Sequence, residues 1–515
     1  MSGVQGAMTK NCTVIIGKER KTLFFSSRVV TLAQLLFLSG IFQGAPLCSG
    51  AGLCGHCRVR FEKRAPDPSG ADLEVFSREE VEGGWRLACR HAPISGSLVR
   101  VLQANTPSSF MPAPGRAGRR TVAVDIGTTI IKWAECRNGS VGPTRSVPNP
   151  QMGAGSEIMA RLAFEAQVKP GMLGELARSF VRGLDLHTED SLVVTGNTVM
   201  IALLLGLPVH GLARAPYSLP WAGGQREMIA PDLPCAYIPP LLAPFLGADV
   251  SAGLACVVQG MEPVPTYPFL YADLGTNGEF VLARDEETFF MASVPMGPAL
   301  EGVGLRFGAP AGSGVITSFD LSPLGLEPDG DLSSSFQAIS GTGYLSLLGA
   351  LKRIGIMDDF GRFASPCTPL AAKIYGSPEG GLGDRIPLPG GMFLDGKDVE
   401  EVLKVKAAWN QAVSVLSAES GVAPGRLTAI YLAGTFGRHV SGEDLEELGF
   451  LPTGGRRGIR CVDDAPLRGG CLLLENPEAG EWCESLRTRT RLVDLSAARG
   501  SGRDLVERMR FSFVP

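Results

Sequence analysis

The chain has 515 residues, 44% hydrophobic and 19% charged, which is the composition of an ordinary globular protein with room for roughly two to four domains. A formal net charge of −4 provides no basic field, which argues against a nucleic-acid partner. No apolar run reaches the roughly 18 residues of a membrane helix, and residues 1–11 lack the apolar core of a secretion signal. We therefore expect a cytoplasmic protein without a membrane partner.

The cysteines divide into a group and a scattered remainder. Twelve cysteines are too few for a disulfide framework in a chain of this length. Four of them fall between residues 48 and 89, and the other eight are scattered. We interpret the scattered ones, among them Cys136, Cys235, Cys256 and Cys461, as small buried apolar residues in a reducing cytoplasm.

The first part of the chain, residues 9–103, has the pattern of a small sheet with a helix. The periodicity predicts strands over 12–16, 22–25, 57–61, 87–90 and 98–102 and helical segments over 31–38 and 78–82. Thr31 is the expected N-cap of the longer helix. Two strands, a helix and then further strands is the β-grasp order of ferredoxins, so we expect a ferredoxin-like domain here.

Three cysteines of the group, Cys48, Cys54 and Cys57, share one glycine-rich loop, and Cys89 follows after a gap of 31 residues. A two-iron cluster needs four thiolates, and glycines allow a loop to wrap it with N–H groups near its sulfurs. The Cys-x5-Cys-x2-Cys spacing is one residue longer than the plant-type pattern. Because a zinc site would more often show two Cys-x2-Cys pairs, we predict a [2Fe–2S] cluster, with a zinc site and a cysteine group without metal as the alternatives. His56, between two of these ligands, is expected to face solvent.

Residues 104–119 separate this domain from the rest of the chain. They contain three prolines and two glycines without periodicity, which is typical of a flexible linker. As a coil, such a linker spans about 20 Å. We therefore expect the cysteine domain to move relative to the rest, as suits an electron carrier that docks, delivers and withdraws.

Residues 120–515 contain two similar segments in which a strand runs into a polar loop. The motif residues are Asp125, Gly127, Thr128 and Thr129 in the first segment and Asp273, Gly275, Thr276 and Asn277 in the second, 148 residues later. This weak internal repeat predicts two similar lobes. The glycines let main-chain N–H groups approach phosphate oxygens, and the threonine hydroxyls add donors. Asp125 and Asp273 are the candidate catalytic residues, because carboxylates there can hold Mg²⁺ or orient an attacking water.

A third loop, with Gly434, Thr435 and Gly437, follows a predicted strand over 427–433, and its glycines would let adenosine lie against the backbone. Loops in the order phosphate, phosphate, adenosine resemble those of the actin, sugar kinase and heat-shock ATPase superfamily. The resemblance implies that 120–515 is a two-lobed α/β ATPase that binds ATP and Mg²⁺. The whole chain is then an α+β multidomain protein.

The segment 398–416 has helical spacing, with Asp398 as its expected N-cap. Its apolar stripe is assigned to the core. Lys406, within this helix, is a weaker candidate for a contact with adenosine.

The pairing of a [2Fe–2S] domain with this ATPase fold resembles one family over nearly the whole chain, the reductive activators of corrinoid proteins. The motifs that carry the resemblance lie at 149–151, 157–161, 195–200, 215–217, 247–249, 297–302 and 449–452. The resemblance implies an ATP-hydrolysing iron–sulfur oxidoreductase that reduces inactive Co(II) corrinoid to Co(I) on the corrinoid protein of a methyltransferase system. It also implies an upstream low-potential electron donor and anaerobic metabolism, and it is compatible with a homodimer.

The chain departs from this family in four places. Larger members have an extra domain at the point where Asp125 here follows the linker almost at once. Ile201 and Ala202 stand where the family often has a histidine, Ser340 stands for the cysteine of Cys-Gly-Ser-Gly, and Leu300 replaces a phenylalanine before Glu-Gly. The motif residues of the phosphate loops are intact, so we expect the chain to bind nucleotide. The departures leave undetermined which corrinoid protein is the partner.

Two other functions are compatible with the sequence. One is a ferredoxin-type electron carrier whose ATPase-like domain only binds a partner, and corrinoid reduction that proceeds equally without ATP would favour it. The other is a small-molecule kinase or an activator of another low-potential enzyme. A kinase would transfer phosphate from labelled ATP to an acceptor rather than to water.

Overall fold

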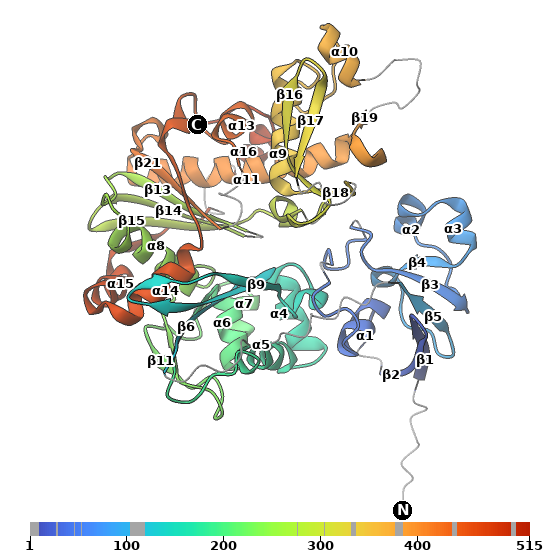
Figure 1. The fold of residues 1–515 in the computed structure, drawn as a ribbon, viewed down its shortest axis with the longest axis horizontal. Coiled ribbons are helices and arrows are strands. Elements are labelled where there is room, and N and C mark those ends of the chain that lie inside the picture. The colour runs from blue at the N-terminus through green and yellow to red at the C-terminus, as the bar shows by residue number, and fades with distance from the viewer. Residues whose placement is uncertain are drawn as a thin grey trace, which may run out of the picture.

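The computed structural model describes residues 10–26, 29–45, 47–52, 54–102, 119–275, 277–302, 304–330, 336–375, 385–434, 440–495 and 501–515. Three units follow one another along the chain (Figure 1). They are an N-terminal unit over residues 10–102, lobe I over residues 119–262 and lobe II over residues 263–515. Figure 1 shows the two lobes stacked on each other, with the N-terminal unit beside lobe I.

The N-terminal unit is built on a sheet with the strand order β2-β1-β5-β3-β4, in which β1 and β5 run parallel. Its elements are β1 (Lys10–Ile16), β2 (Glu19–Phe25), α1 (Leu32–Leu38), β3 (Arg58–Lys63), α2 (Gly70–Val75), α3 (Arg78–Glu82), β4 (Trp85–Leu87), η1 (Ala88–Arg90) and β5 (Leu98–Val101). The predicted cap of α1 is confirmed, because Thr31 and Gln34 form a reciprocal capping box. The strand predicted over 87–90 is wrong in part: Cys89 lies in the turn η1, which follows β4.

Lobe I contains a sheet with the order β11-β12-β10-β6-β7-β8, to which β9 pairs along β7. Its elements are β6 (Thr121–Ile126), β7 (Ile130–Arg137), β8 (Ser140–Val141), β9 (Arg145–Pro148), η2 (Met152–Ala154), α4 (Ile158–Gln167), α5 (Met172–Arg182), β10 (Ser191–Gly196), α6 (Thr198–Leu205), α7 (His210–Ala213), β11 (Gln225–Glu227), β12 (Ala236–Ile238) and α8 (Ala248–Gly260).

Lobe II contains a sheet with the order β22-β21-β13-β14-β15-β23 and two smaller sheets, β17-β16-β18 and β19-β20. Its strands are β13 (Phe269–Leu274), β14 (Asn277–Asp285), β15 (Thr288–Pro295), β16 (Val315–Ser322), β17 (Gly325–Gly330), β18 (Ala338–Ile339), β19 (Arg385–Pro387), β20 (Phe393–Asp395), β21 (Ala429–Ala433), β22 (Ile459–Val462) and β23 (Thr490–Leu492). Its helices include η3 (Pro298–Glu301), α9 (Gly341–Arg353), α10 (Pro369–Tyr375), α11 (Gly396–Ser420), α13 (Gly442–Glu447), α14 (Ala465–Glu475), α15 (Pro477–Arg489) and α16 (Ser501–Arg508).

The internal repeat of the sequence corresponds to a repeat of topology. In lobe I, β6 forms a hairpin with β7 and pairs in parallel with the later strand β10. In lobe II, β13 forms a hairpin with β14 and pairs in parallel with the later strand β21. Asp125 and Asp273 therefore occupy corresponding positions near the carboxyl ends of corresponding strands. The two lobes are joined by a pair of packed helices, since α14 contacts α8 as well as β6 and β10 of lobe I.

Two predictions for the long helix are wrong. The N-cap of α11 is Asp395, whose carboxylate accepts from the main-chain N–H groups of Lys397 and Asp398. Asp398 lies inside the first turn and instead accepts from the N–H of Arg306 at 2.8 Å. Lys406 is fully buried, and its ammonium donates to carbonyl oxygens near the C-terminus, at Arg508 and Ser512. It therefore does not face the nucleotide loops, whereas the predicted apolar stripe of the helix is buried.

The N-terminal unit and lobe I share one apolar core. The ring of Phe37 in α1 meets that of Phe164 in α4 edge to face, with centroids 5.2 Å apart. Gly153 of η2 lies so close to the N-terminal unit that a Cβ there would come within 2.2 Å of the carbonyl oxygen of Phe42. The sequence predicts a mobile cysteine domain, and the structure shows its docked arrangement. Most of the predicted linker, residues 103–118, lies outside the described residues.

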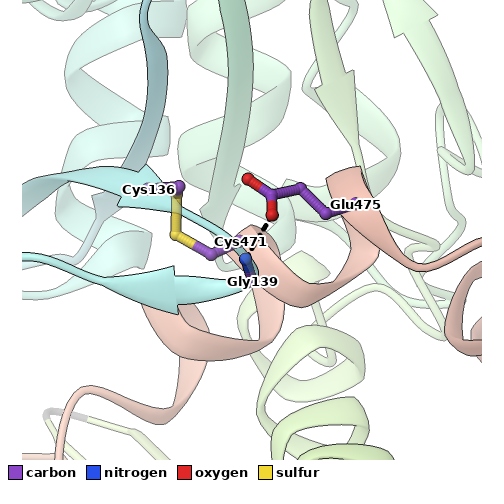
Figure 2. The surroundings of a disulfide bond; sticks show 4 residues. All are labelled: Cys136, Gly139, Cys471 and Glu475. Atoms are coloured by element: carbon purple, nitrogen blue, oxygen red, sulfur yellow. Dashed lines mark hydrogen bonds between the residues drawn. A yellow bond between two sulfur atoms is a disulfide. The ribbon is translucent and has the colours of Figure 1, made fainter.

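The interpretation of the scattered cysteines is wrong in part. Cys136 of β7 and Cys471 of α14 form a disulfide across a sequence separation of 335 residues, shown in Figure 2. Beside it, the N–H of Gly139 donates to the carboxylate of Glu475 on the same helix. Free cysteines at the surface include Cys235, Cys367 and Cys461, whereas Cys256 is buried as predicted. Cysteine usage therefore no longer argues for a reducing compartment.

We expect the disulfide to stabilise the contact of α14 with the lobe I sheet. A dithiol reductant should lower the free energy of unfolding by about 2–4 kcal/mol, because it releases a covalent closure between distant segments. Thermal midpoints with and without reductant measure this. Cys136→Ser protein should lose the sensitivity to reductant and Cys235→Ser protein should keep it. An equal drop in Cys136→Ser protein would contradict the assignment.

The close approach at Gly153 predicts that a single methyl group loosens the docking of the N-terminal unit. Gly153→Ala should cost about 1–3 kcal/mol, because the added carbon overlaps a main-chain oxygen that cannot move alone. Hydrogen exchange of the α1 amides should then rise by about one to two powers of ten. Gly480→Ala is the matched control, since a Cβ there meets nothing within 4 Å. Unchanged α1 exchange in Gly153→Ala protein would show that the shared core does not hold the unit in place.

Candidate functional site

The four cysteines of the group lie together as two pairs. The thiols of Cys48 and Cys54 are hydrogen-bonded to each other, and so are those of Cys57 and Cys89. The hydrogen bond with Cys48, together with burial, raises the pKa of Cys54 well above its usual value. The hydrogen bond with Cys57 lowers the pKa of Cys89. His56 is exposed, as predicted.

The four cysteines match the number of thiolates that a two-iron cluster needs. The pairs Cys48–Cys54 and Cys57–Cys89 could place two thiolates on each iron of such a cluster. A structural zinc ion also takes four ligands, around one centre. Among the described residues, no group of three His, Cys, Asp or Glu side chains stands close enough together to hold one metal ion.

The cysteine loop lies against lobe I. The hydroxyl oxygen of Ser49, next to Cys48, is 3.4 Å from that of Ser156 at the start of the segment that leads into α4. Cys48 and Ser49 therefore stand at the surface where the N-terminal unit meets the lobe that carries the predicted first phosphate loop, residues 125–129.

A cavity of about 110 Å³ lies between the two lobes. It is lined by Asp125, Gly127, Thr128, Thr129, Ile130, Lys132, Asn197, Asp249, Asp273, Leu274, Gly275, Asn277, Glu279, Glu301 and Gly434. The structure thus brings together the described residues that the sequence assigns to nucleotide binding, from both lobes. Thr276, Thr435 and Gly437 of the same predicted set lie outside the described residues.

The first phosphate loop is held in a tight turn by buried amides. A Cβ at Gly127 would come within 2.5 Å of the carbonyl oxygen of Ile130, so the turn requires glycine. The side-chain amide of Asn149 donates to the carbonyl of Gly127 at 2.8 Å. That of Asn197, the N-cap of α6, donates to the hydroxyl of Thr128 at 2.9 Å. These bonds keep the loop in place from two sides.

The cavity concentrates carboxyl groups from both lobes. Burial, followed by the charge of Asp125, raises the pKa of Asp273 to about 6. Burial, followed by the charges of Asp273 and Asp125, raises the pKa of Asp249 well above its usual value. The pKa of Glu279 is raised well above its usual value by burial and then by Asp249. Crowded carboxylates of this kind favour a bound cation, which removes their mutual repulsion.

Lys132 supplies a positive charge to this cavity. It lies opposite Asp125 in the β6–β7 hairpin and pairs with Asp464, the N-cap of α14, at 2.9 Å. Burial raises the pKa of Asp125, and the charge of Lys132 and a 3.0 Å hydrogen bond from Thr195 oppose that rise. The first phosphate loop is therefore linked by charge to α14, one of the two helices that join the lobes.

A further hydrogen bond at the cavity joins the two lobes. The hydroxyl of Thr129 in lobe I donates to the carboxylate of Glu301 in lobe II at 2.6 Å. Small-molecule sites commonly enclose about 300–1,000 Å³. The cavity of about 110 Å³ lies below this range and is large enough for a phosphate group and a metal ion.

Sequence reasoning missed the roles of Lys132, Asp249, Glu279 and Glu301 in this cavity. For two of them a signal existed. Glu279 stands opposite Asp273 in the β13–β14 hairpin just as Lys132 stands opposite Asp125 in the β6–β7 hairpin. A turn centred on each glycine loop would have brought both side chains back to the aspartates. Asp249 enters from α8 and Glu301 from η3, and the positions of these elements depend on tertiary packing.

Across the described residues, no helix is both long enough and apolar enough to span a bilayer.

Comparison with known proteins agrees with this architecture. The corrinoid activation enzyme RamQ of Eubacterium limosum is 26% identical to this chain over 413 residues, which is 73% of this chain and 67% of that protein. The Co(II) methylated amine-specific corrinoid protein reductase of Methanosarcina barkeri is 26% identical over 388 residues, 66% of this chain and 64% of that protein. The chain therefore spans about two thirds of the length of these two relatives.

A solved structure described as a reductive activator for corrinoid, iron-sulfur protein aligns with 97% of this chain and 98% of its own, with a TM-score of 0.64 and 20% identity. This likeness shows a shared fold. A family model described as the RACo middle region matches residues 120–262, which form lobe I. The expectation that the middle domain of the family is missing after the linker is therefore wrong. A second model, described as the C-terminal domain of RACo, the ASKHA domain, matches residues 268–512. The chain belongs to the family of reductive activators of corrinoid proteins, and its C-terminal part is an ASKHA domain.

Proposed function

We propose that this protein uses ATP to reduce the inactive Co(II) corrinoid of a methyltransferase system to Co(I). The observation that carries the proposal is the packing of a domain with two thiol pairs against the lobe that bears the first phosphate loop. An upstream low-potential donor supplies one electron, and Co(II) accepts that electron to become Co(I). The corrinoid protein is the macromolecular partner.

Cys48, Cys54, Cys57 and Cys89 would hold a [2Fe–2S] cluster, and such a cluster supplies one-electron transfer at low potential. The chain's own contribution is to fix the ligands and shield them. Cys57 and Cys89 are buried, whereas Cys48 and Cys54 are partly exposed. The exposed pair marks the side from which an electron partner would approach, since transfer requires a short distance to solvent-facing atoms.

The cleft between the lobes would bind ATP with Mg²⁺. Asp125 and Asp273 would hold the ion or orient the attacking water, and Mg²⁺ neutralises phosphate charge when bound. Main-chain N–H groups of the two glycine loops and the hydroxyls of Thr128 and Thr129 would donate to phosphate oxygens. Lys132 adds a positive charge on the lobe I side.

The adenosine end of the nucleotide would lie against a third loop, on lobe II. Gly434 lines the cavity at the end of β21, and a Cβ there would come within 3.2 Å of a carboxylate oxygen of Asp273. Thr435 and Gly437, which follow it in the sequence, complete the proposed adenosine loop.

ATP is needed because the electron transfer is unfavourable. A plant-type ferredoxin cluster has a potential near about −400 mV. Each unfavourable 59 mV costs about a factor of ten in a one-electron equilibrium. Hydrolysis of ATP to ADP and phosphate moves no electron, so it must act on a conformational equilibrium. The cross-lobe contact between Thr129 and Glu301 is the element that an incoming phosphate would displace, because phosphate and carboxylate repel each other.

The first test follows the formation of Co(I). Anaerobic mixing with a Co(II) corrinoid protein, a reductant and ATP should produce the Co(I) absorption band. Asp125→Ala should slow this by about 100-fold or more, because it removes a ligand for the metal or the attacking water. Cys54→Ala should abolish it, whereas Cys235→Ser, at an exposed free cysteine, should leave it unchanged. Equal rates without ATP would instead support an electron carrier with a partner-binding lobe pair.

The raised pKa of Asp273 predicts a pH dependence for metal–nucleotide binding. Below about pH 6 this carboxyl is protonated and no longer holds Mg²⁺, so the affinity for the Mg²⁺ complex of a non-hydrolysable ATP analogue should fall about tenfold per pH unit. Titrations at pH 7.5 and 5.5 measure this. An affinity that is the same at both pH values would contradict the role of Asp273.

The same group affects stability in the metal-free protein. Its pKa of about 6 lies above the unfolded value of about 3.9, so the folded state binds a proton that the unfolded chain releases. Its contribution to stability is therefore greatest at low pH and is lost as the pH rises through about 6. Asp273→Asn should remove this dependence, whereas Asp320→Asn, at an exposed position of β16, should not.

A further inference from the structure

A buried arginine joins the first phosphate loop to the surface on which the cysteine loop lies. Arg161 of α4 is fully buried. Its Nη2 donates to the carbonyl of Thr128 in the phosphate loop. Its Nε donates to the carbonyl of Gly155 at 2.9 Å, and its Nη1 donates to the side-chain oxygen of Gln151 at 3.1 Å. One rigid guanidinium thus binds two separate stretches of main chain at once.

The segment 149–156, here called the strap, runs between these two regions. At its start, the N–H of Asn149 donates to the carbonyl of Thr129 at 2.8 Å, so it is tied to the phosphate loop. At its end, the hydroxyl of Ser156 lies 3.4 Å from that of Ser49 in the cysteine loop. Arg161 fastens the middle of the strap through Gln151 and Gly155.

The contact at the cysteine loop falls on a conformationally unusual residue. Ser49 has a φ of +51°, a left-handed conformation that non-glycine residues adopt only at some cost in energy. Its neighbour is Cys48, one of the predicted ligands. A small movement of Ser156 would therefore disturb Ser49, because the left-handed backbone conformation of Ser49 depends on its surroundings.

A charged side chain such as that of Arg161 is unusual at a buried position whose role is purely structural. Burial lowers the pKa of the Arg161 guanidinium to about 9, and the negative charge of Glu301 opposes that shift. A buried charge without a directly paired carboxylate is usually less stabilising than an apolar side chain of similar size. Arg161 is electrostatically linked to Glu301, the residue that spans the cleft to Thr129. It therefore sits where the arrival of a phosphate would change both its hydrogen bonds and its electrostatic environment.

We propose that Arg161 is a positioning residue that transmits the occupancy of the first phosphate loop, through the strap, to the cysteine loop. This inference rests on the proposed function, since it assumes that the cleft binds nucleotide. A nucleotide that separates Thr129 from Glu301 shifts the Thr128–Thr129 main chain, and Arg161 carries that shift to Gly155 and Ser156. The cysteine loop then has different surroundings with and without nucleotide.

The test compares the full-length, cluster-loaded wild-type protein with Arg161→Lys. A lysine keeps the charge but cannot hold both carbonyls in one plane. Three quantities are measured with and without a non-hydrolysable ATP analogue and Mg²⁺. They are the affinity for the analogue, the electron paramagnetic resonance spectrum of the reduced cluster, and the hydrogen exchange of the amides in residues 47–57.

Arg178→Lys is the matched control. Arg178 also belongs to a lobe I helix and donates to a main-chain carbonyl, that of Leu204, at 2.7 Å, but it is paired with Glu175 at the surface. It is not among the residues that line the cleft. Arg178→Lys should keep the nucleotide response of the cysteine loop.

In wild-type protein the analogue should change the resonance spectrum and should alter exchange in the cysteine loop several-fold. Arg161→Lys should bind the analogue within about threefold of wild type but lose both responses. Ser156→Ala removes the contact at the far end of the strap, and it should weaken both responses without affecting the affinity for the analogue. This variant provides the test if Arg161→Lys does not fold. A full response in both variants would overturn the inference.

The outcomes also separate this inference from the proposed function. Wild-type protein that forms Co(I) only with ATP but shows no nucleotide response at the cysteine loop overturns the role of Arg161 and leaves the proposed function intact. Wild-type protein that binds no nucleotide overturns both.

Discussion

The apolar contact between the N-terminal unit and lobe I is the constraint on which the rest of the arrangement depends. One helix, α4, provides both Phe164, which packs on Phe37, and Arg161, which holds the Thr128 carbonyl. These two α4 residues are three positions apart, so the same turn of helix serves the docking surface and the phosphate loop. A shift of the docked unit along α4 would therefore disturb the loop, and a shift of the loop would disturb the docking.

The second feature of the molecule is unrelieved negative charge between the lobes. Burial raises the pKa values of Asp125, Asp249 and Asp273 in a partly closed cleft, and the charge of Asp125 raises those of the other two further. Lys132 opposes the rise at Asp125 and Asp273. Such a site is less stable empty than filled, because a cation removes repulsion that burial makes strong. The binding energy of a cation is thus available to move the lobes. The helices α8 and α14, together with the Cys136–Cys471 disulfide, determine which movements of the lobes are possible.

The sequence alone was sufficient to predict the features that depend on a local pattern of residues. The cap at Thr31, the cysteine spacing and the two Asp-x-Gly-Thr loops were readable because each is set by residues a few positions apart. The misses came from tertiary contacts. The α11 cap fell three residues earlier than predicted, at Asp395, and the pairing of Cys136 with Cys471 leaves no local signal over 335 residues. The family resemblance was confirmed by the family models, whereas the roles of individual residues stay proposals.

Linkage provides the most direct test of the central claim, that the nucleotide cleft and the cysteine loop form one coupled unit. If nucleotide binding shifts the equilibrium for reducing the cluster by some factor, then reduction of the cluster must change the nucleotide affinity by the same factor. The measurement is the affinity of the full-length protein for a non-hydrolysable ATP analogue with Mg²⁺, with the cluster oxidised and then reduced under anaerobic conditions. The account predicts affinities that differ by at least about fivefold, the lower end of typical coupling. Equal affinities in the two oxidation states would contradict it.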